Sequence, residues 1–371
     1  MTGFDVAASD ALHARVRAFI DASMVGVACA DAFDALAVEL ARWQAACGAG
    51  VDRLLALRGL SCSRLDRAAD IPAVPTDVFK LRRVACHPPA LDAVVFRTSG
   101  TTIGARGAHP VRTLATYQRA ARAWGRRCLV PDIQHAHWLI LAPPYHKAND
   151  SSLGFMLHDF AGQFGQGATW AVQDGRFEHD AVLRVAELAA RHSCPVVIAG
   201  ASFAFVHCID ALRGERVVLP PASRAMQTGG FKGKTREVDA DALHAMIADA
   251  FGIPMSHVVG EYGMTELSSQ AYDGTLRVAV GTDAPAALPG RYVAPPWMHV
   301  TAVDAVSLLP VPRGEVGIAR IEDLANVDSA VAVQTADRIR VLSDGFELLG
   351  REPSATPRGC SLGVDEILGA S

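Results

Sequence analysis

The chain has 371 residues, of which 50% are hydrophobic and 20% are charged, as is typical of a globular protein with one large domain or two to three smaller ones. Its formal net charge is -4, so it has no excess of basic residues to neutralise a nucleic-acid backbone or an anionic membrane surface. We therefore expect no nucleic-acid partner.

The amino-terminal end lacks the pattern of a secretory signal, because Asp5 and Asp10 stand where such a signal needs basic and then apolar residues. The longest uncharged stretch, residues 192–209, contains Pro195 and Gly200, which favour a buried strand, turn and helix over a membrane span. The eight cysteines show no zinc-like spacing. We expect a cytoplasmic protein with free thiols and no membrane span.

Residues 1–70 have a helical pattern, since Phe33, Leu36, Leu40 and Trp43 fall on one face of a helix. We expect this segment to form a helical layer that packs on the rest of the chain.

From residue 90 the pattern changes to short β-rich runs that alternate with amphipathic helices. The expected strands are AVVF (93–96), WLILA (138–142), PVVIA (195–199) and HVVG (257–260), and the expected helices are residues 113–128, 177–192 and 239–251. This alternation predicts βαβ units and a mainly parallel sheet with helices on both faces. We assign residues 71–292 to this α/β core.

After residue 292 the helical patterns give way to strands with turn signals. Residues 338–342 and 346–350 flank Asp344-Gly345, a pair that favours a tight hairpin. We expect residues 293–371 to form a small β-rich subdomain with a carboxyl-terminal tail.

The segment TSGTTIGARG, residues 98–107, directly follows the AVVF run. Its glycines let a backbone approach an anion, and its hydroxyls and main-chain N–H groups are donors for phosphate oxygens. It matches neither GxxxxGK[ST] nor GxGxxG. Because ligands of open α/β sheets bind beyond the carboxyl ends of strands, this position favours a polyphosphate site. The residues by themselves leave a solvated loop as an equal alternative.

A second segment, VVGEYGMTELSSQ at 258–270, also follows a short apolar run. It supplies Tyr262, Gly263, Thr265 and Glu266, which together have the chemistry to stack on a base, bond a phosphate and hold Mg²⁺. A third segment, QTADRIRV followed by LLGR, places Asp337 and Arg351 near the two ends of the expected hairpin. A carboxylate there could accept both ribose hydroxyls.

These motifs stand in the order and rough spacing found in the adenylate-forming enzymes, which include acyl-CoA synthetases, luciferase and peptide-synthetase adenylation domains. Within that superfamily the chain most resembles the bacterial acyl-protein synthetases of the bioluminescence fatty-acid reductase complex. The resemblance is carried by VPTDVFKLRRV (74–84), QTGGFKGKTREV (227–238) and EYGMTELSSQAY (261–272), and it runs from about residue 70 to the carboxyl end. It implies the large adenylation domain of the superfamily, with ATP and Mg²⁺ as cofactors.

The resemblance also implies a role for each matching residue. Tyr262, with Gly263, would stack on the base, Thr265 would contact phosphate, and Glu266 would hold magnesium. The remaining assignments are the loop over the ATP phosphates at Thr98, Ser99, Gly100, Thr101 and Thr102, the adenine wall at Gly229, Gly230 and Phe231, and the ribose partners Asp337 and Arg351.

Two departures from the superfamily pattern affect this assignment. Ile103 and Arg106 stand where the superfamily usually has glycine and lysine. The chain also stops at Ser371, so we expect the usual carboxyl-terminal domain, with its catalytic lysine, to be absent. The charge that develops on the α-phosphoryl group needs a cation, for which Lys232 is the candidate together with Lys234 and, behind them, Arg106. All three could instead be ordinary surface charges, an alternative that explains Lys234 at least as well.

Two further residues have a functional and an ordinary interpretation. Acyl-protein synthetases carry an acylated cysteine near the carboxyl end, and RGCSL places Cys360 there beside Arg358, which would favour a thiolate. The alternative is a small residue packing a strand. His146, in APPYHKANDSS, would line the carboxylate site or be a hydrogen-bonded core histidine.

The function that the resemblance implies is ATP-dependent activation of a carboxylic acid, expected to be a fatty acid, to acyl-AMP, with transfer of the acyl group to a thiol. The thiol would be Cys360, with an acyl reductase as partner; the alternative acceptors are coenzyme A and a carrier protein. Two other functions remain open. One is a hydrolase with Ser202 as nucleophile, although G-A-S-F-A lacks the second glycine of G-x-S-x-G. The other is a nucleotide sensor without catalysis.

Overall fold

The structure is a computed structural model of the chain, and it describes residues 4–27, 30–98, 106–229, 238–282 and 290–352. Its α-helices are α1 (Val6–Met24), α2 (Ala30–Cys47), α3 (Val51–Leu57), α4 (Val78–Leu81), α5 (Leu114–Leu129), α6 (Ser152–Phe164), α7 (His179–His192), α8 (Ser202–Ala211), α9 (Ala240–Phe251) and α10 (Thr275–Ala279).

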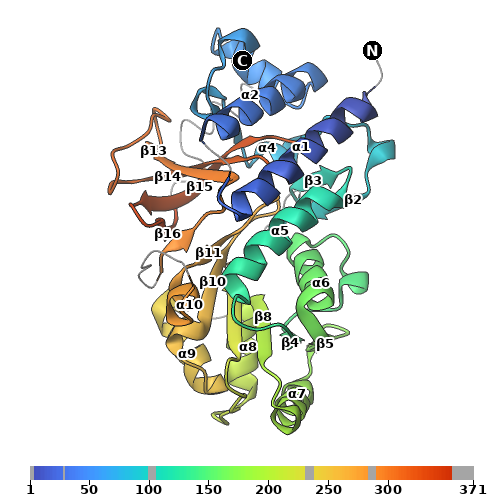
Figure 1. The fold of residues 1–371 in the computed structure, drawn as a ribbon, viewed down its shortest axis with the longest axis vertical. Helices are drawn as coiled ribbons and strands as arrows, with labels where there is room; N and C mark the ends of the chain where they lie inside the picture. Colours follow the sequence, from blue (N-terminus) through green and yellow to red (C-terminus); the bar gives the residue numbers. More distant parts are fainter. Residues whose placement is uncertain (1–3, 28–29, 99–105, 230–237, 283–289, 353–371) are drawn as a thin grey trace. The chain divides into compact units, whose positions relative to one another are not determined.

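The strands are labelled in the same way (Figure 1). They are β1 (Val74–Pro75), β2 (Val94–Arg97), β3 (Ala108–Val111), β4 (Ala136–Ile140), β5 (Gly165–Trp170), β6 (Val172–Gln173), β7 (Arg176–Phe177), β8 (Val196–Ala201), β9 (Arg224–Thr228), β10 (Val258–Tyr262), β11 (Ala271–Asp273), β12 (Tyr292–Val293), β13 (Met298–Val303), β14 (Val316–Asp323), β15 (Ala332–Val341) and β16 (Phe346–Arg351).

The chain divides into two compact units. The first comprises Met1–Ala123, Met264–Gln270 and Ala294–Ser371, and the second comprises Trp124–Gly263 and Ala271–Val293. The chain thus leaves the second unit after β10, contributes seven residues to the first unit, and returns at β11. The division into residues 1–70, 71–292 and 293–371 that we expect from the sequence remains a prediction about domains.

The second unit contains a mainly parallel sheet. Its strands lie in the order β12, β11, β10, β9, β8, β4 and β5, with the run from β10 to β5 parallel and with β11 antiparallel to both neighbours. These parallel strands come from the short apolar runs that alternate with helices in the sequence. A sheet of this kind needs apolar cover on both faces.

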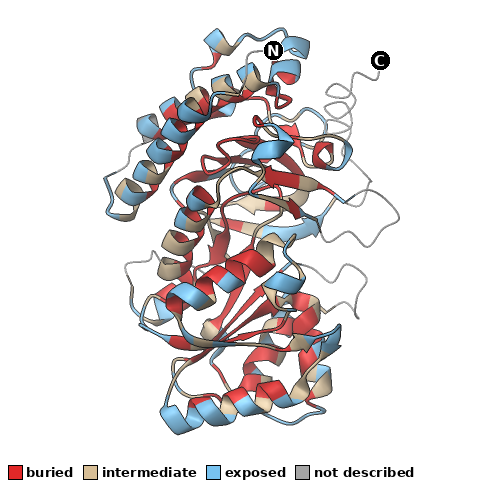
Figure 2. Cartoon of the chain, turned by 90° about the vertical axis from the view of Figure 1, so that its right-hand side faces the viewer, coloured by how far each residue is buried: buried red, intermediate tan, exposed pale blue. Residues whose placement is uncertain are grey.

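Helices supply that cover. On one face, residues of α7, α8 and α9 such as Val185, Phe205 and Ile247 are buried with strand residues of alternate positions, including Leu139 and Ile198. On the other face, Trp138 of β4 meets Phe160 of α6 edge to face at 5.9 Å. Alternate side chains of a strand point to opposite faces, so one strand serves both layers. Figure 2 shows the buried residues concentrated in the strands and on the inner faces of the helices.

The first unit contains an antiparallel sheet in the order β13, β14, β15 and β16, with β1 parallel to β15. The expected hairpin is confirmed as β15 and β16, which are joined through Ser343-Asp344-Gly345. The amino-terminal segment is helical, as expected, and Phe33 of α2 stacks on His299 of β13 at 3.6 Å between ring centroids.

The AVVF run forms a strand, but its expected place in the parallel sheet is wrong. It becomes β2, which pairs only with β3 in a separate antiparallel ribbon. Pro110 lies in β3 and has no N–H group to give to a further strand, which suits a short ribbon better than a sheet interior. The segment TSGTTIGARG is therefore a hairpin connection and not a crossover between a strand and a helix of the sheet.

Within these described ranges, no helix combines the length and the apolar character that crossing a bilayer requires. The described cysteines Cys47, Cys62, Cys86, Cys128, Cys194 and Cys208 are free thiols, as expected.

Candidate functional site

The hairpin of β2 and β3 holds the two ends of the predicted phosphate loop together. The Thr98 amide donates to the Gly107 carbonyl oxygen at 2.9 Å, and the Gly107 amide donates to Thr98 Oγ1 at 2.9 Å. A Cβ atom on Gly107 would lie 2.9 Å from Thr98 Cγ2, closer than two carbon atoms pack. Glycine at 107 therefore lets the threonine close the base of the loop.

Arg106 also binds the base of this loop. Its guanidinium donates from Nε to the Thr98 carbonyl oxygen at 2.6 Å and from Nη2 to the Arg97 carbonyl oxygen at 3.3 Å, while the side chain stays exposed. Charge-assisted bonds of this type are stronger than bonds between neutral groups. The cation that stands where the superfamily usually has lysine thus holds the end of β2.

The segment 264–270, which follows β10, is fixed by side chains from three places. His109 Nδ1 lies 2.7 Å from the Thr265 carbonyl oxygen, and Asn326 Nδ2 donates to the Glu266 carbonyl oxygen at 2.9 Å. Asp323 Oδ2 accepts the amides of Ser268 and Ser269, each at 2.9 Å. A short segment without helix or strand pairing has its backbone groups satisfied in this way.

His109 is the residue that joins this segment to the hairpin. It lies in β3, two residues beyond Gly107, and it is fully buried. Burial lowers the pKa of His109 to about 4, and the bond to the Thr265 carbonyl only partly opposes that shift. The imidazole is therefore neutral at physiological pH. Because a carbonyl oxygen only accepts, Nδ1 carries the proton.

Asp323 is a buried carboxyl at the end of β14. Besides the two amides it accepts the Ser269 hydroxyl at 2.7 Å and the Ala325 amide at 3.0 Å on Oδ1. Burial raises its pKa, and these donors oppose that rise. Trp297 Nε1 also donates to the Ser269 hydroxyl at 3.1 Å, so this hydroxyl is fixed by both a donor and an acceptor.

Glu266 reaches the base of the phosphate loop. Its side chain is buried, and its Oε1 atom would lie 3.5 Å from a Cβ atom placed on Gly107. The fold therefore brings Glu266 and Thr98 together, as their predicted roles in binding one magnesium–triphosphate group require.

The donor set at Glu266 fits Mg²⁺ that enters with a nucleotide. Across the described part of the chain, no three His, Cys, Asp or Glu side chains gather into a metal site. Mg²⁺ typically keeps several waters and binds one or two carboxylates together with substrate phosphates, so a single buried carboxylate beside a hydroxyl-bearing loop suits it.

Asp337 and Arg351 face each other across β15 and β16. They are directly opposite in the strand register, and Arg351 Nε lies 3.2 Å from Asp337 Oδ1. The Arg351 side chain is 72% exposed and the Asp337 side chain only 15%. An ion pair whose cationic partner is mostly exposed contributes little to stability, so Asp337 can exchange Arg351 for another partner at low cost.

In the second unit, three predicted residues lie at the carboxyl ends of neighbouring parallel strands. Ala201, Thr228 and Glu261 are in register across β8, β9 and β10, so Gly229, Tyr262 and Gly263 follow at the same edge of the sheet. Gly229 has a φ of +66°, and no atom of the described residues lies within 4 Å of the Cβ position there. This open, left-handed position suits the close approach of a ligand.

Tyr262 is buried and meets Tyr292 edge to face, at 6.3 Å between centroids and 67° between planes. Its neighbour Glu261 accepts a hydrogen bond from the Thr228 hydroxyl, and burial raises the pKa of Glu261 to about 7. A carboxyl with a pKa near neutrality thus lies at the carboxyl end of β10, and no pattern in the sequence singles it out.

Ser202, the nucleophile of the hydrolase alternative, has no histidine partner among the described residues. Its hydroxyl lies 2.6 Å from both Gln227 Oε1 and the Gly229 carbonyl oxygen. His244 contacts Gln227 instead, at 3.2 Å from Nε2 to Nε2. A hydroxyl that donates to these acceptors is not activated by a base, so the geometry gives the hydrolase alternative no support.

Among the described residues, one further predicted residue, His146, is not brought into these clusters. His146 lies exposed on a short 3-10 helix, Tyr145–Lys147. Outside the described residues lie Ser99, Gly100, Thr101, Thr102, Ile103, Gly230, Phe231, Lys232, Lys234, Arg358 and Cys360.

Sequence reasoning missed His109, Asp323 and Asn326. Asp323 and Asn326 had one signal, since they are polar residues in the otherwise apolar stretch GIARIEDLANVDSAVAV. Buried polar residues in such a stretch need partners, and here the partner is the segment 264–270. His109 had no comparable signal.

The comparisons with known proteins agree with this geometry. The family described as "Acyl-protein synthetase, LuxE" matches residues 64–369. The chain belongs to this family. The resemblance seen in the motifs is thereby confirmed, and α1, α2 and α3 precede the segment that matches the LuxE family. A search of curated proteins found no match.

Solved structures show the same fold at low sequence identity. A 2-hydroxyisobutyryl-CoA ligase in complex with 2-HIB-AMP has a TM-score of 0.63 and 14% identity, covering 86% of this chain and 67% of that one. An open conformation of this ligase with 2-HIB-AMP and CoA has a TM-score of 0.61 and 13% identity, covering 87% and 75%. The α/β adenylate-forming fold expected for the chain is confirmed.

The ATP-bound MatB of Rhodopseudomonas palustris is 17% identical, with a TM-score of 0.49 and 70% of this chain covered. This chain spans 48% of the length of MatB.

Proposed function

We propose that this LuxE-family chain is an acid–thiol ligase that activates a carboxylic acid with ATP as acyl-AMP and passes the acyl group to a thiol. The observation that carries the proposal is the meeting of Thr98, Thr265 and Glu266 at the base of one hairpin, with His109 as the link. Membership of an acyl-protein synthetase family supports the same activity.

In the first half-reaction, a carboxylate oxygen of the acid attacks the α-phosphorus of ATP. The bond from that phosphorus to the bridging oxygen of pyrophosphate breaks, leaving acyl-AMP and pyrophosphate. Bound magnesium would supply positive charge to the phosphate oxygens. The role of Glu266 is to hold it, and the hydroxyl groups of Thr98 and Thr265 would donate to the same oxygens. The loop residues Ser99 to Thr102 take the same role in this proposal.

In the second half-reaction, a thiolate attacks the acyl carbonyl carbon. The bond from that carbon to the AMP oxygen breaks, so the products are a thioester and AMP, and the thiol proton passes to solvent. We propose Cys360 as this thiol. The alternative acceptor, coenzyme A, is favoured by one observation: a ligase of the same fold has been solved with 2-HIB-AMP and CoA. A carrier-protein thiol is the third possibility.

The nucleoside would be held by the remaining predicted residues. Tyr262 and Gly263, with Gly229, Gly230 and Phe231, form the proposed base site, and the open left-handed position at Gly229 supports an approach there. Asp337 would accept the ribose hydroxyls with Arg351 beside it. Lys232 remains the proposed cation for the α-phosphoryl group, and His146 is proposed at the carboxylate.

The proposal extends to the setting of the reaction. We propose a fatty acid as substrate, an acyl reductase as the partner that receives the acyl group, and the cytoplasm as location.

The test of the proposed function is a screen of fatty and aryl acids for acid-dependent exchange of labelled pyrophosphate into ATP. Exchange with at least one acid class is expected. ATP binding without exchange for any acid would favour a nucleotide sensor instead.

A further inference from the structure

One buried amide side chain joins helix α2 to the loop between β14 and β15. Gln44 is completely buried, and its Nε2 atom donates to the carbonyl oxygens of Asn326 at 2.8 Å and Val327 at 2.9 Å. Its Oε1 atom accepts the Val331 amide at 2.9 Å. Two carbonyl acceptors and one N–H donor fix the orientation of the amide, so Gln44 clamps both ends of residues 326–331.

Asn326 continues this chain of hydrogen bonds toward the candidate site. Its Nδ2 atom donates to the carbonyl oxygens of Glu266 at 2.9 Å and Ala330 at 3.0 Å, and its Oδ1 atom accepts the Ser268 hydroxyl at 2.7 Å. All of these groups are buried. An unbroken series of bonds therefore runs from Gln44 through Asn326 to the backbone of the proposed magnesium-binding residue.

We propose that Gln44 is a positioning residue of the adenylation site, which fixes Asn326 and thereby sets the backbone of Glu266 and the hydroxyl of Ser268 for binding of Mg²⁺ and ATP. The inference rests on the proposed function. It assigns a role in that function to a helix that precedes residues 64–369, the segment that matches the LuxE family.

The physical reason is the cost of unsatisfied buried groups. Without the clamp, the Val331 N–H and two carbonyl oxygens would be left without their partner in a site that water does not reach. The loop can relieve that cost only by moving. Any movement carries the Asn326 side chain with it, because the clamped carbonyl and the side chain belong to the same residue.

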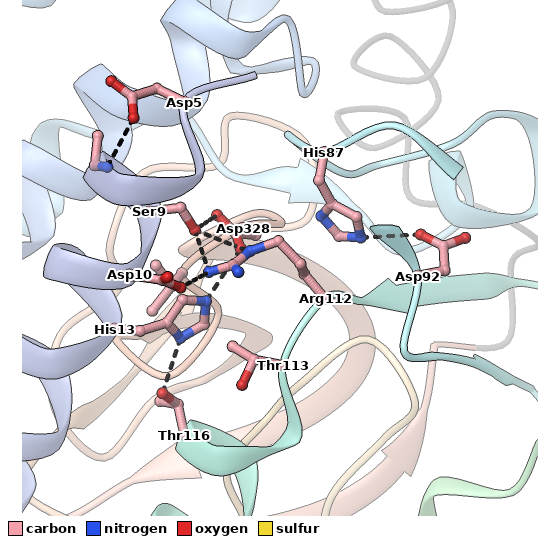
Figure 3. Close-up of polar contacts among 12 residues, drawn as sticks. Asp5, Ser9, Asp10, His13, His87, Asp92, Arg112, Thr113, Thr116 and Asp328 are labelled. Atoms are coloured by element: carbon pink, nitrogen blue, oxygen red, sulfur yellow. Dashed lines mark hydrogen bonds and ion pairs between the residues drawn. The ribbon is translucent and has the colours of Figure 1, made fainter. Parts of the chain in front are cut away.

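A neighbouring cluster provides the matched control (Figure 3). Asp328, on the same loop, accepts the Ser9 hydroxyl at 2.8 Å, His13 Nε2 at 3.1 Å and Arg112 Nε at 2.9 Å. Burial alone would raise the pKa of Asp328, but these bonds hold it below its usual range. This cluster also fastens an amino-terminal helix, α1, to the loop. Among the described residues, this cluster makes no hydrogen bond or ion pair with the segment 264–270. Ser9→Ala therefore weakens the loop without removing any bond between Gln44 and Glu266.

The experiment compares Gln44→Met, which keeps the size of the side chain but not its hydrogen bonds, with Ser9→Ala in the full-length protein, well below both melting temperatures. One readout is acid-dependent pyrophosphate exchange, analysed as separate KM values for MgATP and acid. The other is hydrogen exchange of the Ser268 and Ser269 amides, which does not depend on activity. If Gln44→Met does not fold, Gln44→Glu replaces it in both assays, because Gln44→Glu keeps the acceptor for the Val331 amide.

We expect Gln44→Met to raise the KM for MgATP by about tenfold and to speed amide exchange of Ser268 and Ser269 by about as much, the factor expected for the loss of one or two net hydrogen bonds. The KM for acid should stay within about twofold. Ser9→Ala should lower the melting temperature and change neither readout. Gln44→Met should also be non-additive with Asn326→Asp, which removes the donor to Glu266, because both break one chain.

The inference is overturned if Gln44→Met only lowers the melting temperature, as Ser9→Ala does, with MgATP affinity and amide exchange as in the wild type. Absence of pyrophosphate exchange in the wild-type protein would overturn the proposed function instead. In that case the amide exchange of Ser268 and Ser269 still decides whether Gln44 controls the backbone of the segment 264–270.

Discussion

The Nδ1 atom of His109 lies 2.7 Å from the backbone carbonyl oxygen of Thr265, although the two residues are 156 positions apart in the chain. This bond connects the hairpin that bears the predicted phosphate loop to the segment that bears Glu266. A buried histidine makes it, and burial, which lowers the pKa of His109 to about 4, keeps the imidazole neutral although this bond alone would favour the charged form.

We expect His109→Leu to raise the KM for MgATP and to lower stability by about 1–3 kcal/mol, because the Thr265 carbonyl would stay buried without its donor. His109→Asn, whose amide nitrogen can take the place of Nδ1, should retain most of the MgATP affinity and most of the stability. Pyrophosphate exchange and thermal unfolding measure the two effects. Equal losses in the two variants would show that the ring fills space and that its hydrogen bond is unimportant.

The same residue predicts a pH dependence of stability. Since the pKa of His109 falls to about 4 on folding from a usual value of 6.5, the unfolded chain binds more protons between these values. His109 therefore destabilises the fold as the pH falls from about 6.5 to 4, by up to about 3 kcal/mol. Burial raises the pKa of Glu261 from 4.5 to about 7, and this shift stabilises the fold as the pH falls through that range. The effect of His109 is therefore measured as the difference in stability between the wild type and His109→Asn.

Glu266→Gln should reduce acid-dependent pyrophosphate exchange by at least about 100-fold, since the proposed magnesium ligand loses its charge while the side chain keeps its size. The fold should survive, because Asn326 bonds the backbone carbonyl of Glu266 and not its carboxylate. Glu315→Gln, the same change at an exposed position, is the control. Activity near that of the control in a folded Glu266→Gln protein would remove Glu266 from the metal site.

Asp337→Ala should raise the KM for ATP by about tenfold and leave the KM for acid nearly unchanged, because it removes the proposed acceptor of the ribose hydroxyls. Stability should change little, since its ion pair with Arg351 is largely exposed on the arginine side. Titration of ATP binding measures the effect. An unaltered ATP affinity would mean that the hairpin of β15 and β16 does not meet the nucleotide.

Cys360→Ser should leave pyrophosphate exchange intact and should abolish the protein-bound thioester that hydroxylamine releases, because adenylation precedes the transfer to a thiol. Mass spectrometry after incubation with ATP and the best acid locates the acyl group. If Cys360 of the wild type stays unmodified while coenzyme A or a carrier protein is acylated, that acceptor takes the place of Cys360 in the proposed function.

Much of the second unit could be predicted from the sequence. Its helices α7 and α9 have clear amphipathic periods, and its strands β4, β8 and β10 are short apolar runs between them, so local pattern and tertiary burial agree. The run AVVF looked the same, yet it forms a hairpin. An apolar run does not specify which strand it pairs with. Here β2 pairs with β3, the next strand in the chain, in an antiparallel hairpin.

The candidate site was predictable only at residues that belong to a recognisable motif. Thr98, Thr265 and Glu266 belong to such motifs, whereas His109, Asp323, Asn326 and Gln44 act on the backbone of a segment far away in the chain. A buried hydrogen bond between distant residues leaves no periodicity or spacing in the sequence. The support of the site therefore became visible only in the folded chain.

The central claim is that a carboxylate oxygen attacks the α-phosphorus of ATP. Its most direct test is to supply the best acid with both carboxylate oxygens replaced by ¹⁸O, to trap the acyl group on hydroxylamine or a thiol, and to analyse the nucleotide by mass spectrometry. We expect AMP with one ¹⁸O atom and unlabelled pyrophosphate. Formation of ADP and phosphate, or of AMP without ¹⁸O, would contradict it.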